Sequence, residues 1–422
     1  MSPKQALSAV SKALLALAVW LRFAHSVAAQ SNFKVLYSFT GGADGGGLYY
    51  GVVMDKQGKL YGTTSGGGAY NYGTVFELAP TKQGEWTETV LHSFMNGDPN
   101  GYDAVGNLII DGVGNLYGVA ESGGPYFGGT AFELTPGANG WSFSVLYDFC
   151  ATAGDPCSPR SNLIMDRTGN FYGAEAGGAN GGGAVFELTP DSGGWVGSLL
   201  YSFCSRPSCK DGSVLYAGVI LDAAGNLYGT TAGGGDPSCI GGNGCGVVYE
   251  LRRSGGSWSE AVLHAFTGAP NDSDGSSLLA FGSAGNLYGT GGGGSYICFG
   301  SSPCGTVYKM KRGANGHWHE TVIYNFTGGA DGNGPPDGVV VDQAGNLYGT
   351  TVYGGSASCG CGVVFKLMPG SGGKWTYSVL HTFVGSDGAQ PIGGLILRNG
   401  KLYGTAVTGG SGGAGVVFEL IP

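Results

Sequence analysis

Charged side chains are scarce in this chain, and helical periodicity is absent from most of it. Asp, Glu, Lys and Arg make up 12% of the 422 residues, and the formal net charge is −9. An acidic, weakly charged chain lacks the basic surface that neutralises phosphates, which excludes nucleic acid as a partner. After residue 30, no stretch places apolar residues at the spacing of an amphipathic helix. The sequence therefore excludes a helical domain.

Glycine is abundant, with 87 residues, and much of it falls in a repeated pentapeptide related to Gly-Asn-Leu-Tyr-Gly. The steps between successive copies are 56, 55, 56, 60, 60 and 55 residues. A period of this size indicates repeated supersecondary units that bury their apolar faces against their neighbours. The tyrosine of the pentapeptide recurs at Tyr61, Tyr117, Tyr172, Tyr228, Tyr288, Tyr348 and Tyr403.

Each repeat carries four short runs that are rich in Val, Tyr, Phe and Thr and bounded by Gly, Asn and Asp, a pattern typical of strands. In the first copy these are Gly51-Val-Val-Met-Asp55, the pentapeptide around Tyr61, Gly73-Thr-Val-Phe-Glu-Leu78, and Trp86 to Phe94. We label them segments A, B, C and D. An Asp and a Gly between A and B predict tight antiparallel hairpins. Because side chains alternate along a strand, the Leu and Tyr of segment B should pack against opposite neighbouring units.

The two ends of the repeat region complement each other. It begins with a segment D, Phe33-Lys-Val-Leu-Tyr-Ser-Phe39, and stops after a segment C, Val416-Val-Phe-Glu-Leu420. Pairing of these two segments would satisfy both open edges, which predicts an all-β fold, a seven-bladed β-propeller closed by the N-terminal strand in the last blade. The alternative, a glycine-rich β-helix or β-roll, has a much shorter natural period and gives no reason for complementary ends.

The N-terminus has the pattern of a targeting segment, so we predict a signal peptide at 1–29 and a single propeller domain at 30–422. A basic start is followed by the apolar stretch 13–21 and by Val27-Ala28-Ala29, small residues suited to cleavage. The apolar stretch is too short to span a bilayer. Arg22 directly after it leaves an uncleaved, membrane-retained form as the alternative.

Ten cysteines fall into five close pairs, which in an exported chain indicates disulfides. All five would lie in D-to-A or B-to-C connections, which emerge at the same face of the disc. The competing interpretation is zinc binding by Cys359-Gly-Cys361, but no histidine stands in the same loop and no second such pair repeats it. The predicted pairs are Cys150–Cys157, Cys204–Cys209, Cys239–Cys245, Cys298–Cys304 and Cys359–Cys361.

The same face carries the variation in loop length, so a binding site is expected there. Its D-to-A loops repeat an Asp near a Gly, and a ring of carboxylates could bind calcium or sugar hydroxyls. Asn271-Asp272-Ser273-Asp274-Gly275 comes closest to a calcium loop. The simpler interpretation is an Asx turn that starts each segment A. These weak ligand-binding candidates are Asp44, Asp98, Asp155, Asp211, Asp274, Asp331 and Asp387.

Two acids break the repeat instead of following it. Glu121 and Glu175 stand after segment B in the second and third copies, where the other copies continue Tyr-Gly-Thr. A pair of carboxylates is the minimum apparatus of a glycosidase, which makes these two the candidate catalytic residues. Solvated loop acids without a catalytic role are the alternative.

Histidine is not expected on the variable loops. His92, His264 and His381 occupy a position in segment D that four other copies fill with tyrosine, and His317 and His319 lie at the opposite end of that segment. No Gly-x-Ser-x-Gly elbow stands between a strand and a helix. Hydrolase and lyase mechanisms that use a histidine base are therefore disfavoured.

The full motif, Gly-Asn-Leu-Tyr-Gly-Thr-Thr followed by Gly-Gly and Gly-Val-Val-Phe-Glu-Leu, resembles the Gloeobacter/Verrucomicrobia-type tandem repeat over about residues 33–422. The resemblance implies an exported bacterial protein. Segments A and B are also similar to those of NHL and lactonase-type propellers, a likeness of fold alone.

We therefore expect a secreted, periplasmic or cell-surface monomer that binds an extracellular glycan or protein through its disulfide-braced face. No cofactor is expected, with calcium as the one candidate ion, and neither is a membrane span in the mature chain. The alternative function is an enzyme, a glycosidase or lyase, that acts on extracellular polysaccharide through loop carboxylates.

Overall fold

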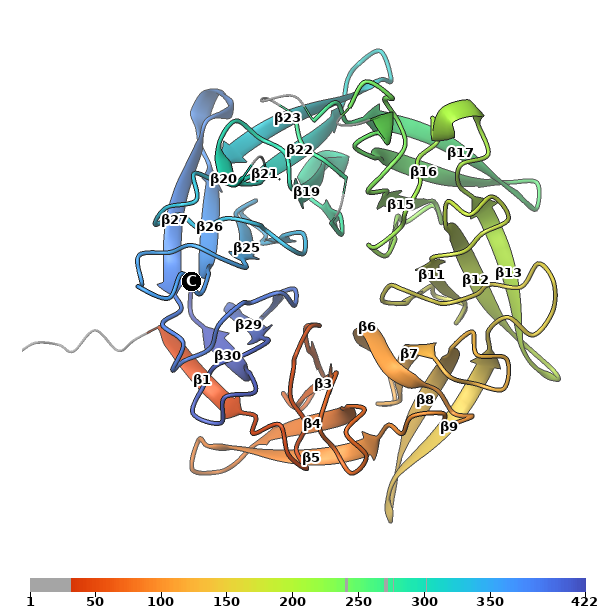
Figure 1. The fold of residues 1–422 in the computed structure, drawn as a ribbon, viewed down its shortest axis with the longest axis vertical. Helices are drawn as coiled ribbons and strands as arrows, with labels where there is room; N and C mark the ends of the chain where they lie inside the picture. Colours follow the sequence, from red (N-terminus) through yellow and green to blue (C-terminus); the bar gives the residue numbers. More distant parts are fainter. Residues whose placement is uncertain (1–31, 240–241, 269–271, 276, 301) are drawn as a thin grey trace, which may run out of the picture.

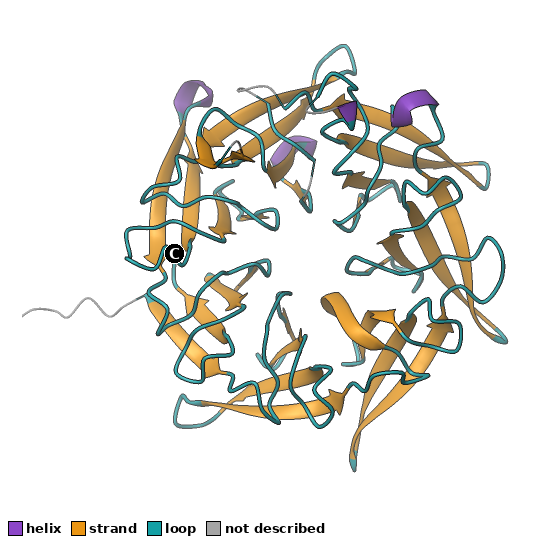
Figure 2. Cartoon of the chain, in the orientation of Figure 1, coloured by secondary structure: helices purple, strands orange, loops and turns teal. Residues whose placement is uncertain are grey.

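The computed structural model describes residues 32–422 except 240–241, 269–271, 276 and 301. The predicted signal peptide therefore lies outside the described residues. Seven four-stranded antiparallel sheets stand around a central axis as blades, which confirms the predicted all-β fold and seven-bladed β-propeller (Figures 1 and 2). Among the described residues, no helix has the length and apolar character needed to cross a membrane.

Each blade runs from an innermost strand A to an outermost strand D. Blades one to three comprise β2 (Val53–Met54), β3 (Leu60–Thr64), β4 (Thr74–Pro80) and β5 (Trp86–Ser93); β6 (Tyr102–Ile110), β7 (Leu116–Ser122), β8 (Thr130–Gly137) and β9 (Gly140–Asp148); and β10 (Ile164–Met165), β11 (Phe171–Glu175), β12 (Ala184–Asp191) and β13 (Gly194–Ser202). Blades four and five comprise β14 (Ile220–Leu221), β15 (Leu227–Thr230), β16 (Val247–Ser254) and β17 (Ser257–Ala265); and β18 (Ala280–Phe281), β19 (Leu287–Gly291), β22 (Thr306–Arg312) and β23 (Trp318–Asn325).

Blades six and seven comprise β24 (Val340–Val341), β25 (Leu347–Thr351), β26 (Val363–Pro369) and β27 (Trp375–Thr382); and β28 (Ile396–Arg398), β29 (Lys401–Ala406), β30 (Val416–Leu420) and β1 (Phe33–Ser38). The remaining elements are a small hairpin of β20 (Ile297–Phe299) and β21 (Ser302–Pro303) and three 3-10 turns at Pro207–Cys209, Ser283–Gly285 and Ser371–Gly373. The outermost strand of blade seven is thus N-terminal. β1 pairs antiparallel with β30, from Phe33 opposite Leu420 to Ser38 opposite Val416.

The core consists of seven apolar clusters, each between two adjacent blades. In blade one, Leu60 belongs to the cluster shared with blade seven, while Tyr61 belongs to the cluster shared with blade two. The same division holds for Leu116 and Tyr117 in blade two. Alternation along strand B therefore joins each blade to both neighbours, as the sequence predicts.

The A-to-B hairpins also follow the prediction. In blade one, Asp55 Oδ1 accepts hydrogen bonds from the backbone N–H groups of Gln57 and Lys59, and Gly58 takes a φ of 87° that favours glycine. The Tyr61 hydroxyl lies 3.1 Å from Asp55 Oδ2. The pentapeptide tyrosine therefore ties the hairpin to the strand that follows it.

Strand A is shorter than its apolar run predicts, because five of the seven comprise only two residues. Before four of these strands the chain makes only an isolated bridge beside the end of strand B, for example Gly46 with Gly66 and Ser213 with Gly233, so the ladder between A and B is interrupted. Blade two differs, since β6 continues through a bulge between Val105 and Ile109.

All five predicted disulfides are formed. Two lie in D-to-A connections and three in B-to-C connections, which in an antiparallel meander emerge at one end of the blades. We call this end of the disc the loop face and the opposite end the hairpin face.

Candidate functional site

A cavity of about 170 Å³ lies on the axis, and residues from all seven blades line it. Each blade contributes part of the segment that connects the loop face to strand A. Such a volume is below the several hundred Å³ typical of drug-sized ligands, so it suits a small group such as one sugar ring. The residues of this axial cavity that carry polar or aromatic side chains are Tyr49, Tyr50, Asn107, Arg160, Ser161, Asn162, Tyr216 and Asp337.

One position in the lining segments separates two blades from the rest. Two residues before the first buried apolar residue of segment A, five copies carry a small residue: Gly106, Ser161, Ala217, Ser277 and Gly393. Blade one has Tyr50 there and blade six has Asp337. Since the fold requires only a small residue at this position, these two side chains depart from the repeat inside the cavity itself.

Asp337 is held at the cavity wall by its neighbour in the ring. The backbone N–H of Gly394 donates to its carboxylate, and a Cβ added at Gly394 would lie 2.4 Å from Asp337 Oδ2. Glycine at 394 is therefore what allows the close approach. Burial raises the pKa of Asp337 to about 6, and the Gly394 hydrogen bond opposes the shift. The carboxyl can thus accept or donate a hydrogen bond near neutral pH.

Tyr50 is anchored through its backbone, because its carbonyl accepts a hydrogen bond of 2.9 Å from Thr405 Oγ1 of blade seven. Burial raises the pKa of its phenol, so the hydroxyl stays protonated as a donor. Tyr49 and Tyr216, which also line the cavity, remain 46% and 56% exposed. Their accessible ring faces can stack on an apolar ligand surface.

Arg160 brings the cation of the cavity lining. Its Nε lies 2.9 Å from Glu121 Oε1, and its backbone N–H donates to the carbonyl of Ala174. Glu121 is the last residue but one of β7. The carboxylate of blade two therefore holds the side chain of Arg160, a residue of the cavity lining from blade three.

Glu175, the other candidate catalytic acid, is fully buried. It accepts hydrogen bonds from the backbone N–H groups of Cys157 and Gly178, the latter at 2.6 Å. Burial raises its pKa, and these two donors counteract the shift. Glu175 thus holds the Cys150–Cys157 loop against blade three, and no solvated acid lies at this position.

The repeated Asp residues of the D-to-A loops lie in loop-forming hydrogen bonds. Asp44 accepts from the backbone N–H and hydroxyl of Thr40, and Asp331 accepts the same pair from Thr327. Asp155 does so from Thr152. Asp98 accepts from the Asn100 N–H, Asp387 from the Val384 N–H and His381, and Asp211 from Ser205, Arg206 and Tyr201.

In blade four's loop to blade five, the equivalent residue is Asp272 and not Asp274. The Asp272 carboxylate accepts from the Thr267 N–H and hydroxyl, both at 2.7 Å, while Asp274 accepts from the Gly292 N–H across the loop face. Assigning Asp274 to the repeated set is therefore wrong. The longer loop contains two acids, and only the contact with Thr267 distinguishes them.

The fold and the axial cavity define the class of protein. It is a seven-bladed β-propeller in which two side chains that differ from the repeat, Tyr50 and Asp337, line a cavity on the axis. The chain belongs to the Gloeobacter/Verrucomicrobia repeat family, whose model matches residues 24–240 and 216–422. No curated protein is significantly similar in sequence.

Several solved structures are similar to this chain at low sequence identity. They include an ancestral GH74 enzyme (13% identity, 86% of this chain and 55% of that chain, TM-score 0.49), a luciferin-regenerating enzyme (15%, 76% and 91%, 0.45) and a gluconolactonase from Xanthomonas campestris (14%, 92% and 89%, 0.40). At these identities and scores, the likenesses carry no activity over to this chain.

Sequence reasoning missed Tyr50, Arg160 and Asp337. The available signal was a comparison of the seven copies at the position before segment A, where a tyrosine and an aspartate replace small residues. That comparison gains meaning only once the backbone places the position on the axis.

Proposed function

We propose that this protein is an exported binding module that takes a terminal sugar of an extracellular glycan into its axial cavity. The observation that carries this proposal is the position before segment A, where Tyr50 and Asp337 replace the small residues of five other blades. Side chains that the fold does not require, gathered in one concave site, support a ligand-binding role.

The chemistry of the lining matches a sugar better than an apolar ligand. Asp337 and Arg160 provide an acceptor and a donor with opposite charge, Asn107 and Asn162 add amide groups, and the accessible rings of Tyr49 and Tyr216 provide flat apolar surfaces. A sugar ring combines hydroxyls around its edge with apolar C–H faces, and this lining offers partners to both.

The five disulfides and the repeat family are consistent with an extracellular or periplasmic location, where such glycans occur. We also propose that the β1–β30 pairing closes the ring and keeps the seven contributions to the cavity in register.

The alternative enzymatic function loses support from the two candidate acids. Glu121 is engaged by Arg160, and Glu175 is buried behind the Cys157 loop. Asp337 is the carboxylate that lines the cavity, whereas a glycosidase uses two carboxyl groups that flank the scissile bond. Binding without turnover fits this arrangement better.

A glycan array with the mature protein, with and without calcium, tests the proposal, followed by calorimetry on the strongest ligand. Replacing Asp337 by Asn should weaken binding roughly 10–100-fold, as expected when a hydrogen bond to a charged group is lost. Glu85→Gln is the matched control, since it makes the same change at an exposed position on the hairpin face and should leave affinity unaltered.

Three outcomes would contradict the proposal. If no glycan binds, or if Asp337→Asn and Glu85→Gln bind equally well, the axial cavity is not a glycan site. If a polysaccharide panel yields product that is lost in Asp337→Asn, the enzymatic alternative replaces the binding module.

A further inference from the structure

The outermost strands of adjacent blades meet through one recurring pair of side chains. One partner is the Tyr or His near the end of strand D. The other is the residue two places after the tryptophan of the next strand D, or Phe33 in β1, which has no tryptophan. In three junctions the two rings stack: His92 on Phe143 at 4.0 Å, Tyr324 on Tyr377 at 4.2 Å and His381 on Phe33 at 3.6 Å. In a fourth junction Gly197 leaves room for the Tyr147 hydroxyl.

The three remaining junctions carry a glutamate at the second position: Glu88, Glu260 and Glu320. Each glutamate lies near the Asp that accepts the loop-forming hydrogen bonds of the preceding D-to-A loop, which we call the capping Asp. In each glutamate, the Oε1 atom is buried without a hydrogen-bond partner. Two carboxyl groups brought together in a partly buried site repel one another unless a proton or a cation intervenes.

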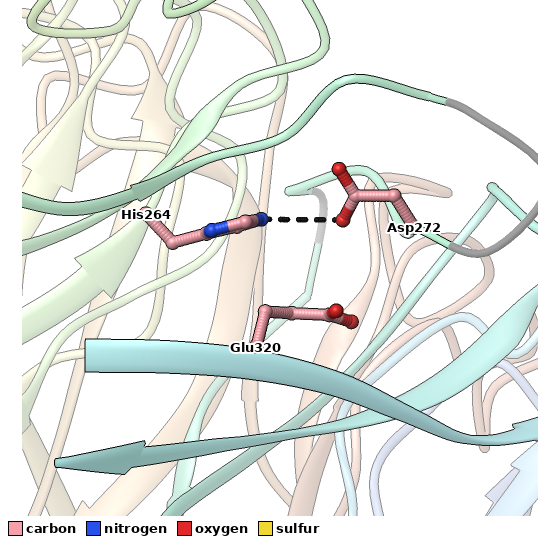
Figure 3. Close-up of side chains that lie close together, drawn as sticks. All are labelled: His264, Asp272 and Glu320. Carbon is pink, nitrogen blue, oxygen red and sulfur yellow. Dashed lines mark hydrogen bonds and ion pairs between the residues drawn. The ribbon is translucent and has the colours of Figure 1, made fainter. Parts of the chain in front are cut away.

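The junction between β17 and β23 differs from the other two because its ring is a histidine (Figure 3). One ligating atom each of His264, Asp272 and Glu320 lies within 4.8 Å of the others, and this is the one such group among the described residues. His264 Nε2 and Asp272 Oδ1 are 3.2 Å apart. Glu320 reaches toward them from the neighbouring blade.

The electrostatic states of the two acids are unequal. Burial, together with the charge of Asp272, raises the pKa of Glu320 to about 8. Although burial opposes ionisation of Asp272, hydrogen bonds from His264 and Thr267 hold its pKa down at about 2. The site therefore favours added positive charge near Glu320.

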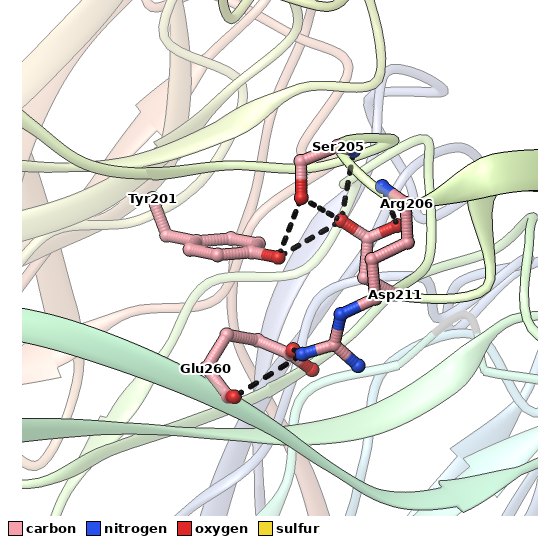
Figure 4. A network of polar contacts seen from close by, with 5 residues as sticks. All are labelled: Tyr201, Ser205, Arg206, Asp211 and Glu260. Atoms are coloured by element: carbon pink, nitrogen blue, oxygen red, sulfur yellow. Dashed lines mark hydrogen bonds and ion pairs between the residues drawn. The ribbon is translucent and has the colours of Figure 1, made fainter.

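The junction between β13 and β17 shows how the same arrangement is neutralised by the protein itself (Figure 4). There Tyr201, Asp211 and Glu260 occupy the equivalent positions, and the guanidinium of Arg206 pairs with Glu260 Oε2. Arg206 directly follows Ser205, whose backbone N–H donates a hydrogen bond to the carboxylate of Asp211. The residue that follows the corresponding Thr267 is Gly268, which has no side chain to supply a cation.

We propose that His264, Asp272 and Glu320 bind a divalent transition metal ion of the zinc type, which clips blade four to blade five. One imidazole nitrogen and two carboxylate oxygens are ligands that zinc accepts, whereas calcium prefers oxygen ligands alone. With bonds of about 2.0–2.1 Å, ligand atoms of a tetrahedral zinc site lie about 3.3 Å apart. The 3.2 Å between His264 Nε2 and Asp272 Oδ1 is already close to this value, so Glu320 is the ligand that must move inward.

The site is accessible to an ion, since 24% of the His264 side chain and 11% of the Asp272 side chain are exposed. A water molecule can fill the fourth position. Binding would replace the proton of Glu320 and the hydrogen bond between His264 and Asp272 by metal–ligand bonds. The role is structural and independent of the axial cavity.

Titration of untagged, chelator-treated mature protein with zinc chloride tests this inference, with calorimetry for stoichiometry and a thermal melt for stability. One equivalent should bind and raise the melting temperature. His264→Tyr and Glu320→Gln should each lower affinity by more than the ~10–100-fold that loss of an outer-shell partner costs. Glu88→Gln, at the matched junction with a tyrosine ring, should leave zinc binding unchanged.

Both variants are expected to fold, because tyrosine occupies the His264 position in four other junctions and Gln is isosteric with Glu. Circular dichroism checks this point. The inference is overturned if the wild-type protein binds no stoichiometric zinc, or if folded His264→Tyr and Glu320→Gln bind it as tightly as the wild type does.

Discussion

The junction between β13 and β17 and the junction between β17 and β23 start from the same backbone and end with different chemistry. Both bring a capping aspartate against a glutamate of the next blade. The first adds Arg206 and a tyrosine, and the second adds a histidine and a glycine. In the first junction, Arg206 of the same chain therefore compensates the charge of Glu260. In the second junction, the charge of Glu320 can be compensated by a proton or a bound ion.

The junctions with stacked rings show that the fold does not require an acid pair between adjacent blades, whether an arginine, a proton or an ion compensates it. His381 and Phe33 meet face to face, and Glu is absent from that pair. A buried charge pair seldom stabilises a protein more than well-packed apolar groups of the same size do. The three glutamates are thus departures from the repeat that the fold tolerates, like Tyr50 and Asp337 on the axis.

The largest effect on stability is expected at the third glutamate junction, between β1 and β5, where Tyr37 lies near Glu88. Here one of the two strands is the N-terminal strand β1, which pairs with β30. Deleting residues 33–39 removes this junction together with Phe33, Leu36 and Phe39, apolar side chains worth about 1.5–3 kcal/mol each when fully buried. It also exposes the edge of β30. We expect loss of cooperative unfolding or a large drop in melting temperature by calorimetry.

If the truncated protein melts like the intact mature chain, β1 does not close the ring. A useful control is deletion of the residues before Asn32, which should leave the melt unchanged because strand β1 begins at Phe33.

A smaller effect is expected when the internal cation of the β13–β17 junction is removed. Arg206→Met should destabilise the protein by roughly 1–2 kcal/mol at pH 8, because the ionised Glu260 loses its partner. At pH 5 the cost should nearly vanish, since burial raises the pKa of Glu260 to about 7 even against the opposing charge of Arg206. Urea unfolding at both pH values measures the difference.

The double variant Arg206→Met with Glu260→Gln provides the control, and its stability should no longer depend on pH between these values through this pair. Equal destabilisation by Arg206→Met at pH 5 and pH 8 would mean that Arg206 acts through packing alone.

The sequence predicted what the copies share, because a feature that recurs along the chain gives the same signal several times. The blade count, the opposite packing of Leu60 and Tyr61 and the Asp55 hairpin all follow from positions that recur. The burial of Glu175 could not be predicted in this way. One of its two donors, the Cys157 N–H, lies 18 residues away in the disulfide loop of a single copy, and no sequence pattern links the two residues.

For the site, the sequence predicts a face of the disc but not the residues of the axial cavity. Recurrence marked the loop-face aspartates, which the structure assigns to turns, whereas Asp337 and Arg160 occur once each and have no motif. Asp337 and Arg160 line the same cavity because segments from seven blades converge on the axis. The strand pairing within one repeat does not determine this convergence. The exchange of Asp272 for Asp274 has a similar cause, since a longer loop shifts the capping residue.

The smallest expected effect concerns the pH dependence of stability that the glutamate junctions share. Burial raises the pKa values of Glu88 and Glu260 to about 7 and that of Glu320 to about 8, well above the 4.5 of a free glutamate. A carboxyl group whose pKa is raised on folding binds its proton more tightly in the folded state. Its contribution is therefore fully present below about pH 4.5 and is lost as the pH rises through 7 to 8.

In metal-free protein, the melting temperature should accordingly fall between pH 5 and pH 8.5, and Glu320→Gln should make this fall shallower because the amide does not titrate. The low pKa of Asp272 acts in the opposite sense but only below about pH 4, outside this window. Adding zinc chloride should also flatten the wild-type profile, since a bound ion keeps Glu320 ionised at no cost to the folded state. A melting temperature that rises across this range, or a slope that Glu320→Gln leaves intact, would show that the junction carboxyls do not set the pH response.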